Sequence, residues 1–235
     1  MDLECVFRRV GKQISADRVS AEFHPYSELK HTWRHRRGTV FFRISDYMDA
    51  SPEPVVEALA WFLLCRAYGK RCPDGMAGRY LEHARSREMW APKKPVYMGR
   101  ARNLAFRPVG AHRDLGAVFD YVNSCYFGGS IRRPDLAWAR ESPSVRLGFY
   151  FEPLDILAAN RALDSEKVPR YVLEFVMYHE LLHGVLDAKG TPTRRLHHTK
   201  EFRERERRFS MYDEAEEWLS RLARRKRAEK GVPQV

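Results

Sequence analysis

The amino-acid sequence predicts an α+β fold, in which small sheets pack against helices. Two alternating segments, residues 30–36 and 39–45, flank Arg37-Gly38 and predict a β-hairpin. Segments with the apolar spacing of a helix follow, among them residues 168–187. With 235 residues, of which 44% are apolar, the chain can bury a core as one larger or two small domains.

Residues 1–90 are predicted to form a separate amino-terminal α+β region. After the hairpin, Ser51-Pro52 predicts the start of a helix, with the serine as N-cap and the proline in the first turn. Apolar residues nearly encircle this helix, which predicts that it is the core helix of the region. A shorter helix, at about 78–86, follows a turn. The role of this region stays open between a scaffold, a selector and a cover.

The rest of the chain divides into three parts. Residues 91–111 form a basic connector, whose prolines and glycines predict little regular structure. Residues 112–219 form a second α+β domain, and residues 220–235 form a basic tail. Within this domain the sequence predicts a helix at 115–125, then strands around 135–140, 146–151 and 154–158, and then a helix at 168–187. A last helix is predicted to begin at Thr199, with an apolar stripe formed by Phe202, Phe209 and Leu219.

One motif in the segment 168–187 carries chemistry, namely His179-Glu180-x-x-His183. Helix positions four apart lie on one face, so both imidazoles can reach a single metal ion. Glu180 lies about 100° around the helix, where its carboxylate can take a proton from a water held at that ion. This spacing is the HExxH signature, whose glutamate is the general base of metallopeptidases.

The neighbours of the motif favour a metal site over two ordinary polar histidines. Val172 and Val176 precede His179 and His183 by seven residues and share their face, which is therefore apolar for two turns. Buried imidazoles need partners, and one ion satisfies both. Gly184, directly after the second histidine, leaves room for another segment to approach closely.

A zinc site needs a third protein ligand from elsewhere in the chain. The next histidines are His197 and His198, directly before Thr199, a good N-cap. His198 is favoured, because a neutral imidazole at the junction of loop and helix suits zinc well. A carboxylate of the following helix, Glu201 or Glu204, is the alternative.

Four stretches of the second domain follow one another in the order found in a known family. They are Asp114-Leu115 through Tyr126-Phe127-Gly128-Gly129, Leu136-Ala137-Trp138 with Arg146-Leu147-Gly148-Phe149-Tyr150, Asp155-Ile156-Leu157 with Arg161-Ala162-Leu163, and Tyr178-His179-Glu180-Leu181-Leu182-His183 with His198-x-x-Glu201-Phe202. This ordered set resembles the SprT-like zinc metallopeptidases and covers residues 112–219, about half of the chain.

The resemblance implies a zincin-like catalytic domain, in which a small sheet lies over the active-site helix and its edge strand can pair with an extended substrate. It assigns one Zn²⁺ per chain to His179, His183 and His198, and the catalytic base to Glu180. Thr199 stands where the family commonly has a glycine. Many members carry a Cys-rich zinc ribbon after this domain, and the sequence contains no C-x-x-C spacing.

Composition bounds the partners and the compartment. The net charge is +11, with basic clusters at 30–37, 92–113 and 221–230. Such clusters suit phosphate contacts, and Trp33 could stack on an unpaired base, so nucleic acid is a candidate partner. The apolar run 58–65 is too short to span a membrane. Without the layout of a signal peptide, and with four cysteines expected to be reduced and half-buried, the protein is expected in the cytoplasm.

The expected activity is that of a zinc-dependent endopeptidase acting on a protein or peptide substrate. Three imidazoles hold zinc, and Glu180 takes the proton of the attacking water. Tyr212 and Arg195 are candidate helpers at the developing oxyanion. Two alternatives stay open: a nucleic-acid-binding protein whose zinc is only structural, and a zinc hydrolase that acts on RNA or another non-peptide substrate.

Overall fold

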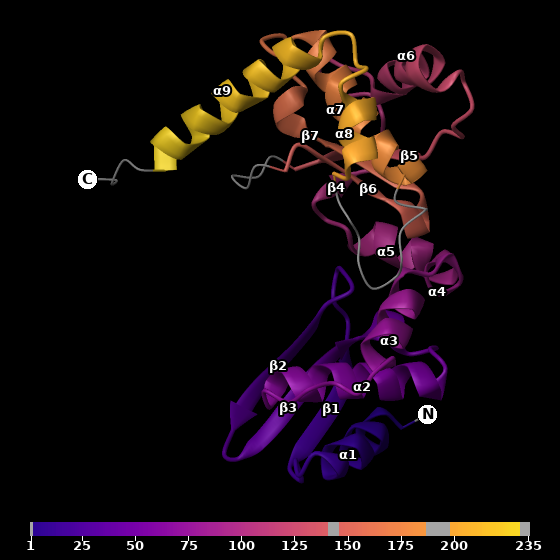
Figure 1. Ribbon diagram of the computed structural model, residues 1–235, viewed down its shortest axis with the longest axis vertical. Helices are drawn as coiled ribbons and strands as arrows, with labels where there is room; N and C mark the ends of the chain where they lie inside the picture. Colours follow the sequence, from indigo (N-terminus) through magenta and orange to yellow (C-terminus); the bar gives the residue numbers. More distant parts are fainter. Residues whose placement is uncertain (1, 141–145, 187–197, 231–235) are drawn as a thin grey trace. The chain divides into compact units, whose positions relative to one another are not determined.

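A computed structural model describes residues 2–140, 146–186 and 198–230, the last six of these by their backbone alone (Figure 1). The chain divides into two compact units, Met1–Arg102 and a second that begins at Asn103. Each unit combines helices with a small mixed sheet, so the predicted α+β class is confirmed. The segment predicted as a connector, 91–111, is divided between the two units.

The amino-terminal unit is a three-stranded sheet with helices on one face. Its main elements are α1 (Leu3–Gln13), β1 (Val19–His24), β2 (His31–Arg36), β3 (Thr39–Ser45), α2 (Glu53–Ala67), α3 (Met76–Arg85), α4 (Arg87–Trp90) and α5 (Lys94–Arg100). Strand β3 is central, parallel to β1 and antiparallel to β2. Alternation along β3 places Val40, Phe42 and Ile44 in one core with the apolar residues of α1 and α2.

Three predictions for this unit are confirmed and two are wrong. The hairpin β2–β3 forms, α2 is buried around most of its circumference, and α3 matches the helix predicted at about 78–86. However, α2 begins at Glu53 without a side-chain cap, and the Ser51 hydroxyl lies 3.0 Å from Nε2 of His83 instead. The connector is not irregular throughout, because it contains α5, whose last residue Arg100 makes two hydrogen bonds of 2.7 and 2.8 Å to Asp46.

The second unit is a four-stranded sheet with α7 packed against it. Its elements are β4 (Leu104–Ala105), α6 (Leu115–Phe127), β5 (Asp135–Ala139), β6 (Gly148–Phe151), β7 (Ile156–Asn160), α7 (Arg170–Leu186), α8 (Lys200–Glu206) and α9 (Tyr212–Lys230). The strand order is β4-β5-β7-β6, with β5 and β7 parallel and the outer pairs antiparallel. Among the described strands, β6 pairs only with β7 and is therefore an edge of the sheet.

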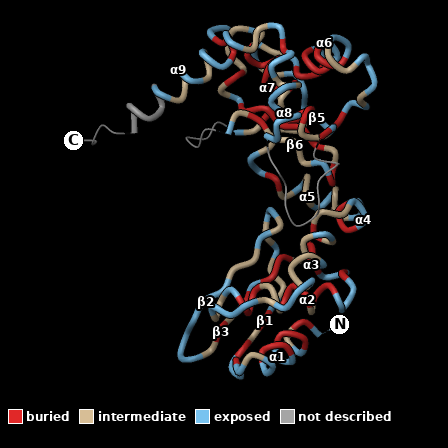
Figure 2. The backbone as a smooth tube through the Cα atoms, viewed as in Figure 1, coloured by how far each residue is buried: buried red, intermediate tan, exposed pale blue. Residues whose placement is uncertain are grey.

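The helices and strands predicted for this unit form, with one difference at its carboxyl end. One helix was predicted from Thr199 onward, but the chain breaks it between α8 and α9. Phe209 lies in the break and is 3% exposed, stacked on the rings of Tyr126 and Tyr178. The break therefore lets an apolar ring enter the core, where Figure 2 shows α7 as a largely buried helix.

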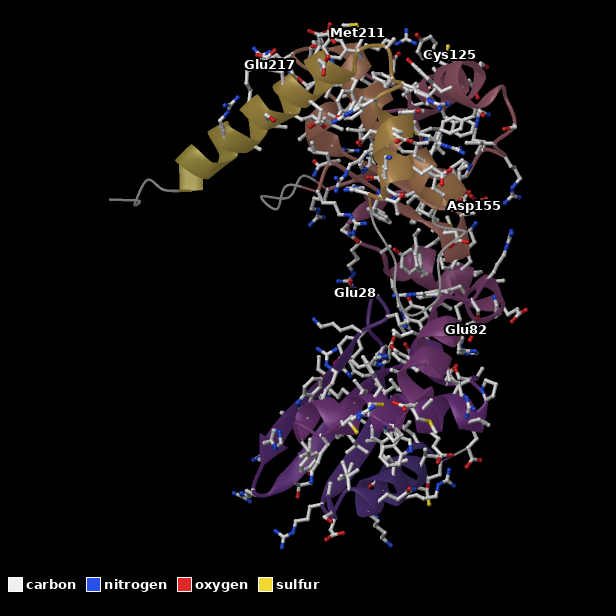
Figure 3. All side chains as sticks on the ribbon, viewed as in Figure 1. Glu28, Glu82, Cys125, Asp155, Met211 and Glu217 are labelled. Atoms are coloured by element: carbon white, nitrogen blue, oxygen red, sulfur yellow. The ribbon has the colours of Figure 1, made fainter. Side chains whose placement is uncertain are left out.

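The described residues contain no helix with the length and apolar character needed to cross a bilayer. All four cysteines are free thiols, but the expected half-burial holds only for Cys72. Cys65 is buried in α2, whereas Cys5 and Cys125 are exposed, the latter on α6 (Figure 3).

Candidate metal centre

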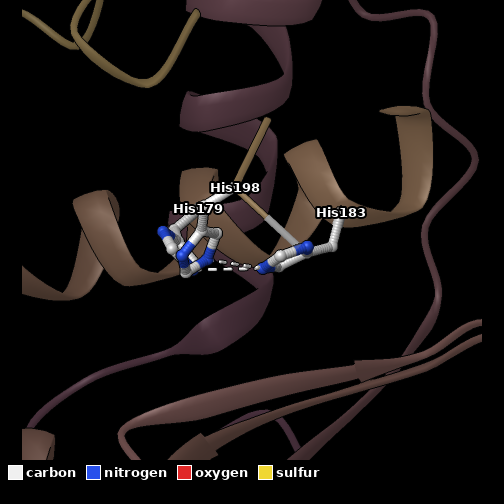
Figure 4. A group of neighbouring side chains, drawn as sticks. All are labelled: His179, His183 and His198. Atoms are coloured by element: carbon white, nitrogen blue, oxygen red, sulfur yellow. Dashed lines mark hydrogen bonds between the residues drawn. The ribbon is translucent and has the colours of Figure 1, made fainter. Parts of the chain in front are cut away.

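Three histidines from two segments converge at the carboxyl half of α7 (Figure 4). His179 and His183 lie one turn apart on the helix, and their Nε2 atoms are 3.2 Å apart. His198 directly precedes the N-cap of α8, and its Nε2 is 3.3 Å from that of His183. The structure therefore brings together the three residues that the sequence singled out, as one group with the geometry to hold a metal ion.

The spacing of these nitrogens fits a tetrahedral ion. Two ligand atoms about 2.05 Å from a tetrahedral zinc lie roughly 3.3 Å from each other. The two measured separations, 3.2 and 3.3 Å, match that edge. Three neutral imidazoles also leave the fourth position of such an ion open, as a catalytic site requires.

Glu206, which the sequence did not indicate, fixes the orientation of His179. Its carboxylate lies 2.5 Å from Nδ1 of His179, so Nδ1 carries the proton and Nε2 keeps its lone pair for a metal. Burial lowers the pKa of His179, but the hydrogen bond to Glu206 and the charges of Glu180 and Glu206 outweigh it, and the pKa is raised overall. The backbone beside Glu206 is tied to α7, because the Tyr178 hydroxyl donates a 2.6 Å hydrogen bond to the Arg205 carbonyl.

Phe202 supports all three imidazoles from behind. Its ring is 1% exposed, and its centroid lies 5.2, 4.6 and 4.8 Å from those of His179, His183 and His198. The predicted N-cap is confirmed, since the Thr199 hydroxyl accepts a 3.1 Å hydrogen bond from the Phe202 amide. The cap and the buried ring together place the start of α8 beside α7.

His198 occupies an uncommon backbone conformation. Its φ is +56°, in the left-handed region that few residues other than glycine adopt. Residues held in this region cost roughly 1 kcal/mol or more and persist where the surroundings over-determine them. Such a conformation at the third histidine is consistent with a functional requirement for its position.

Glu180 lies in the same cavity as the imidazoles and is 8% exposed. Burial raises the pKa of its carboxyl, whereas the charges of His179 and Arg146 and the backbone N–H of Tyr150 lower it. The net shift is upward, in the direction that brings a carboxylate closer to the basicity of a general base at neutral pH.

Two glycines let β6 approach α7 closely enough to enclose Glu180. A Cβ at Gly148 would lie 2.9 Å from Cγ of Glu180 and from Cγ1 of Val176. A Cβ at Gly184 would lie 2.5 Å from the Tyr150 ring, which confirms that another segment uses the space beside this glycine. The sheet edge is therefore in direct contact with the face of α7 that carries Glu180.

The site opens into a cavity of about 390 Å³. Its walls come from β6 and the residues before it, from α7 and from α9, and it is lined by Arg146, Leu147, Gly148, Tyr150, Glu152, Phe175, Val176, His179, Glu180, His183, His198, Glu216 and Leu219. The apolar side chains that line the cavity lie beside the three histidines. The edge strand β6 forms one side of the cavity.

The alternative ligands lie elsewhere. Glu201 pairs with Arg205 at 2.9 Å, and Glu204 lies 3.8 Å from Lys200 with 61% of its side chain exposed. Neither belongs to the group formed by the three histidines. Tyr212 packs its ring 5.7 Å from that of Phe175 and does not line the cavity, and Arg195 lies outside the described residues.

Sequence reasoning missed Glu206, Gly148 and Arg146 for a common reason. Glu206 follows Phe202 by four residues and so shares its face, but nothing in the sequence shows that this face meets His179. Gly148 and Arg146 approach Glu180 from another element of the fold.

No family model, no curated protein and no solved structure matches this chain.

Proposed function

We propose that the protein is a zinc-dependent endopeptidase of the SprT-like type, with the cavity at the end of α7 as its active site. The observation that carries this proposal is the convergence of three imidazoles, in which Nε2 of His183 lies at the edge length of a zinc tetrahedron from those of His179 and His198, with the carboxylate of Glu180 in the same cavity. A purely structural ion would require the imidazoles but not a buried acid beside them.

Each residue of the site has a defined task. His179, His183 and His198 hold the ion, Glu206 keeps His179 in the required tautomer, and Phe202 keeps the three rings in place. Bound zinc would act as a Lewis acid, which lowers the pKa of a water molecule toward 7 and polarises the scissile carbonyl. Glu180 accepts the proton of the attacking water and passes it to the leaving amine.

The surroundings of the site suit a polypeptide substrate. Strand β6 is an edge strand and lines the cavity, so its backbone groups can pair with an extended chain laid across the site. The cavity is open at the surface and has apolar walls for side chains next to the scissile bond, which favours an endopeptidase.

The test is an assay of the zinc-loaded full-length protein on casein and on single-stranded nucleic acid, with Glu180→Gln beside the wild type. We expect wild type to cleave casein alone and to hold one zinc per chain. Glu180→Gln should retain the zinc and lose roughly 10²–10⁴-fold in rate or more.

Glu174→Gln is the matched control, because Glu174 is also buried on α7 but pairs with Arg170 away from the cavity. Its proteolysis should stay close to that of wild type. Undiminished cleavage by Glu180→Gln, or purified protein without bound metal, would rule out the proposal. If the protein cleaved the nucleic acid and not the casein, the alternative of a zinc hydrolase with a non-peptide substrate would be correct instead.

A further inference from the structure

The sheet of the amino-terminal unit has one face that no described element covers. Helices α1 and α2 pack on the side of Val40 and Phe42. Strand register places the remaining side chains of the three strands together on the opposite side. We name this side the open face; it consists of Ser20, Glu22, Thr32, Arg34, Arg36, Thr39, Phe41 and Arg43.

The open face is cationic. Arg34, Arg36 and Arg43 are all exposed, and the only acid among its residues, Glu22, is neutralised by a 2.8 Å ion pair with Arg43. Arg34 and Arg36 alternate along the edge strand β2, so both guanidinium groups project from the same side. The exposed Arg37 continues the positive charge into the hairpin turn.

An aromatic ring lies at the centre of this face. Phe41 is partly exposed on the middle strand, with Ser20 and Arg34 as its direct neighbours across the sheet. The Arg34 guanidinium lies 5.8 Å from the centre of its ring. A recess of about 340 Å³ opens here, lined by residues of all three strands, Phe41 and Arg34 among them, and also by Trp33 and Phe42 of the helix side.

We propose that the open face binds single-stranded nucleic acid. The arginines of β2 contact backbone phosphates, and Phe41 stacks on an unpaired base, with the hydroxyls of Ser20 and Thr32 beside it. A row of cations beside a partly exposed ring on a sheet is a combination that binds single strands without reading their sequence. This binding does not require the metal site.

The chemistry of the face favours this occupant over others. A duplex keeps its bases stacked inside and would leave Phe41 without a partner. A membrane surface would need a protruding apolar side chain, whereas Phe41 lies in a recess. A run of acidic residues, such as polyglutamate, would satisfy the arginines but offers no flat ring to the phenyl group.

The sequence named Trp33 as a candidate stacking residue, and Trp33 is 36% exposed and also lines the recess. Trp33 lies opposite Phe42 in the register, and the two ring centroids are 6.3 Å apart. Because Phe42 belongs to the core beneath α1 and α2, Trp33 lies on the helix side of the sheet. Phe62 on α2, whose ring also lies beside an arginine, with Arg66 at 5.4 Å, is the matched control for Phe41.

The experiment measures binding of the full-length protein to fluorescein-labelled oligothymidylate, oligouridylate and a duplex of equal length by anisotropy at low and moderate salt. The variants are Arg34→Ala with Arg36→Ala, and Phe41→Leu. The matched controls are Arg79→Ala with Arg87→Ala, two exposed arginines outside the sheet, and Phe62→Leu on α2. Circular dichroism confirms that each variant is folded, and polyglutamate serves as an acidic competitor.

We expect both single strands to bind more tightly than the duplex. The double arginine variant should bind at least tenfold more weakly. The slope of its log binding constant against log salt concentration should fall by nearly two, as expected for the loss of two phosphate contacts. Phe41→Leu should weaken binding roughly tenfold. The controls should bind like wild type.

The proposal fails if wild type does not bind at low salt, if duplex or polyglutamate binds as well as single strands, or if the control arginine variant loses as much affinity as the double variant of β2. Since the arginines are exposed, their substitution decides the question even if Phe41→Leu does not fold.

Discussion

Helices α2 and α7 have similar roles in their units but differ in what they bury. Both are long apolar helices in the core of a small α+β unit, with 15 and 17 residues. Every buried residue of α2 is apolar, whereas α7 also buries Glu174 and Glu180 and carries two half-buried histidines.

This difference lies in the polar groups that α7 buries and in how each of them is compensated. A buried charge costs several kcal/mol unless it is paired, so an apolar helix keeps polar groups only where something compensates them. Glu174 is compensated by Arg170 at 2.6 Å. Glu180 instead faces a cavity beside three imidazoles, which a bound cation would complete. If α2 contributes to stability alone and α7 to both stability and the site, substitutions in the two helices should differ in their effect on zinc binding.

The largest effect on stability should come from substitutions that create a cavity beside either helix. Leu64→Ala in α2 and Leu182→Ala in α7 each remove a side chain that is at most 1% exposed, and each should cost about 2–5 kcal/mol. Hydrogen exchange should show lost protection in the first unit for Leu64→Ala, with zinc affinity unchanged. Leu182→Ala should weaken zinc binding as well, because it is adjacent to His183. Equal zinc affinity in both variants would remove the distinction between the helices.

The first unit should lose stability in mild acid through His31. Burial lowers the pKa of His31 from 6.5 to about 4. The unfolded chain therefore binds the proton first, so stability is complete above pH 6.5 and falls as the pH drops toward 4, by about 3 kcal/mol in total. Urea unfolding across this range measures the loss.

His31→Gln should flatten this pH dependence. In the native state Nδ1 accepts a 3.2 Å hydrogen bond from the Ser45 amide, and Nε2 lies 2.9 Å from the Tyr80 hydroxyl, contacts that a glutamine can partly reproduce. His35→Gln, on the same strand but exposed, should leave the curve as in wild type. An unchanged slope in His31→Gln would assign the acid sensitivity to other groups.

Gly148→Ala should affect stability and activity together. The added methyl group overlaps Glu180 and Val176, and overpacking of this kind costs about 1–3 kcal/mol. Because β6 must then move away from α7, proteolysis should fall more than stability alone explains. Gly99→Ala, whose Cβ would meet nothing within 4 Å, is the control and should be neutral. Thermal unfolding and casein hydrolysis measure the two effects.

The smallest effect should be seen in Glu206, which touches the site only through His179. Glu206→Ala should weaken zinc binding about 10–100-fold, as is typical when the carboxylate behind a metal-binding histidine is lost. The amide oxygen of Glu206→Gln can still accept a hydrogen bond from Nδ1–H of His179, so this variant should recover part of the affinity. Glu204→Ala, exposed on the same helix, is the control. Competition with a zinc chelator gives the affinities, and equal values for all variants would show that Glu206 has no role in orienting His179.

The sequence by itself determined the features that depend on local geometry. The i, i+4 spacing of His179 and His183 places them on one helix face, alternation around Arg37-Gly38 makes the hairpin, and Thr199 caps α8. Tertiary structure alone decided which distant groups meet these elements. It brought His198 rather than Glu201 or Glu204 to the pair, and it set Glu206 behind His179. The physical reason is that these contacts depend on how helices and strands pack across the core, and packing is specified by side chains far apart in the chain.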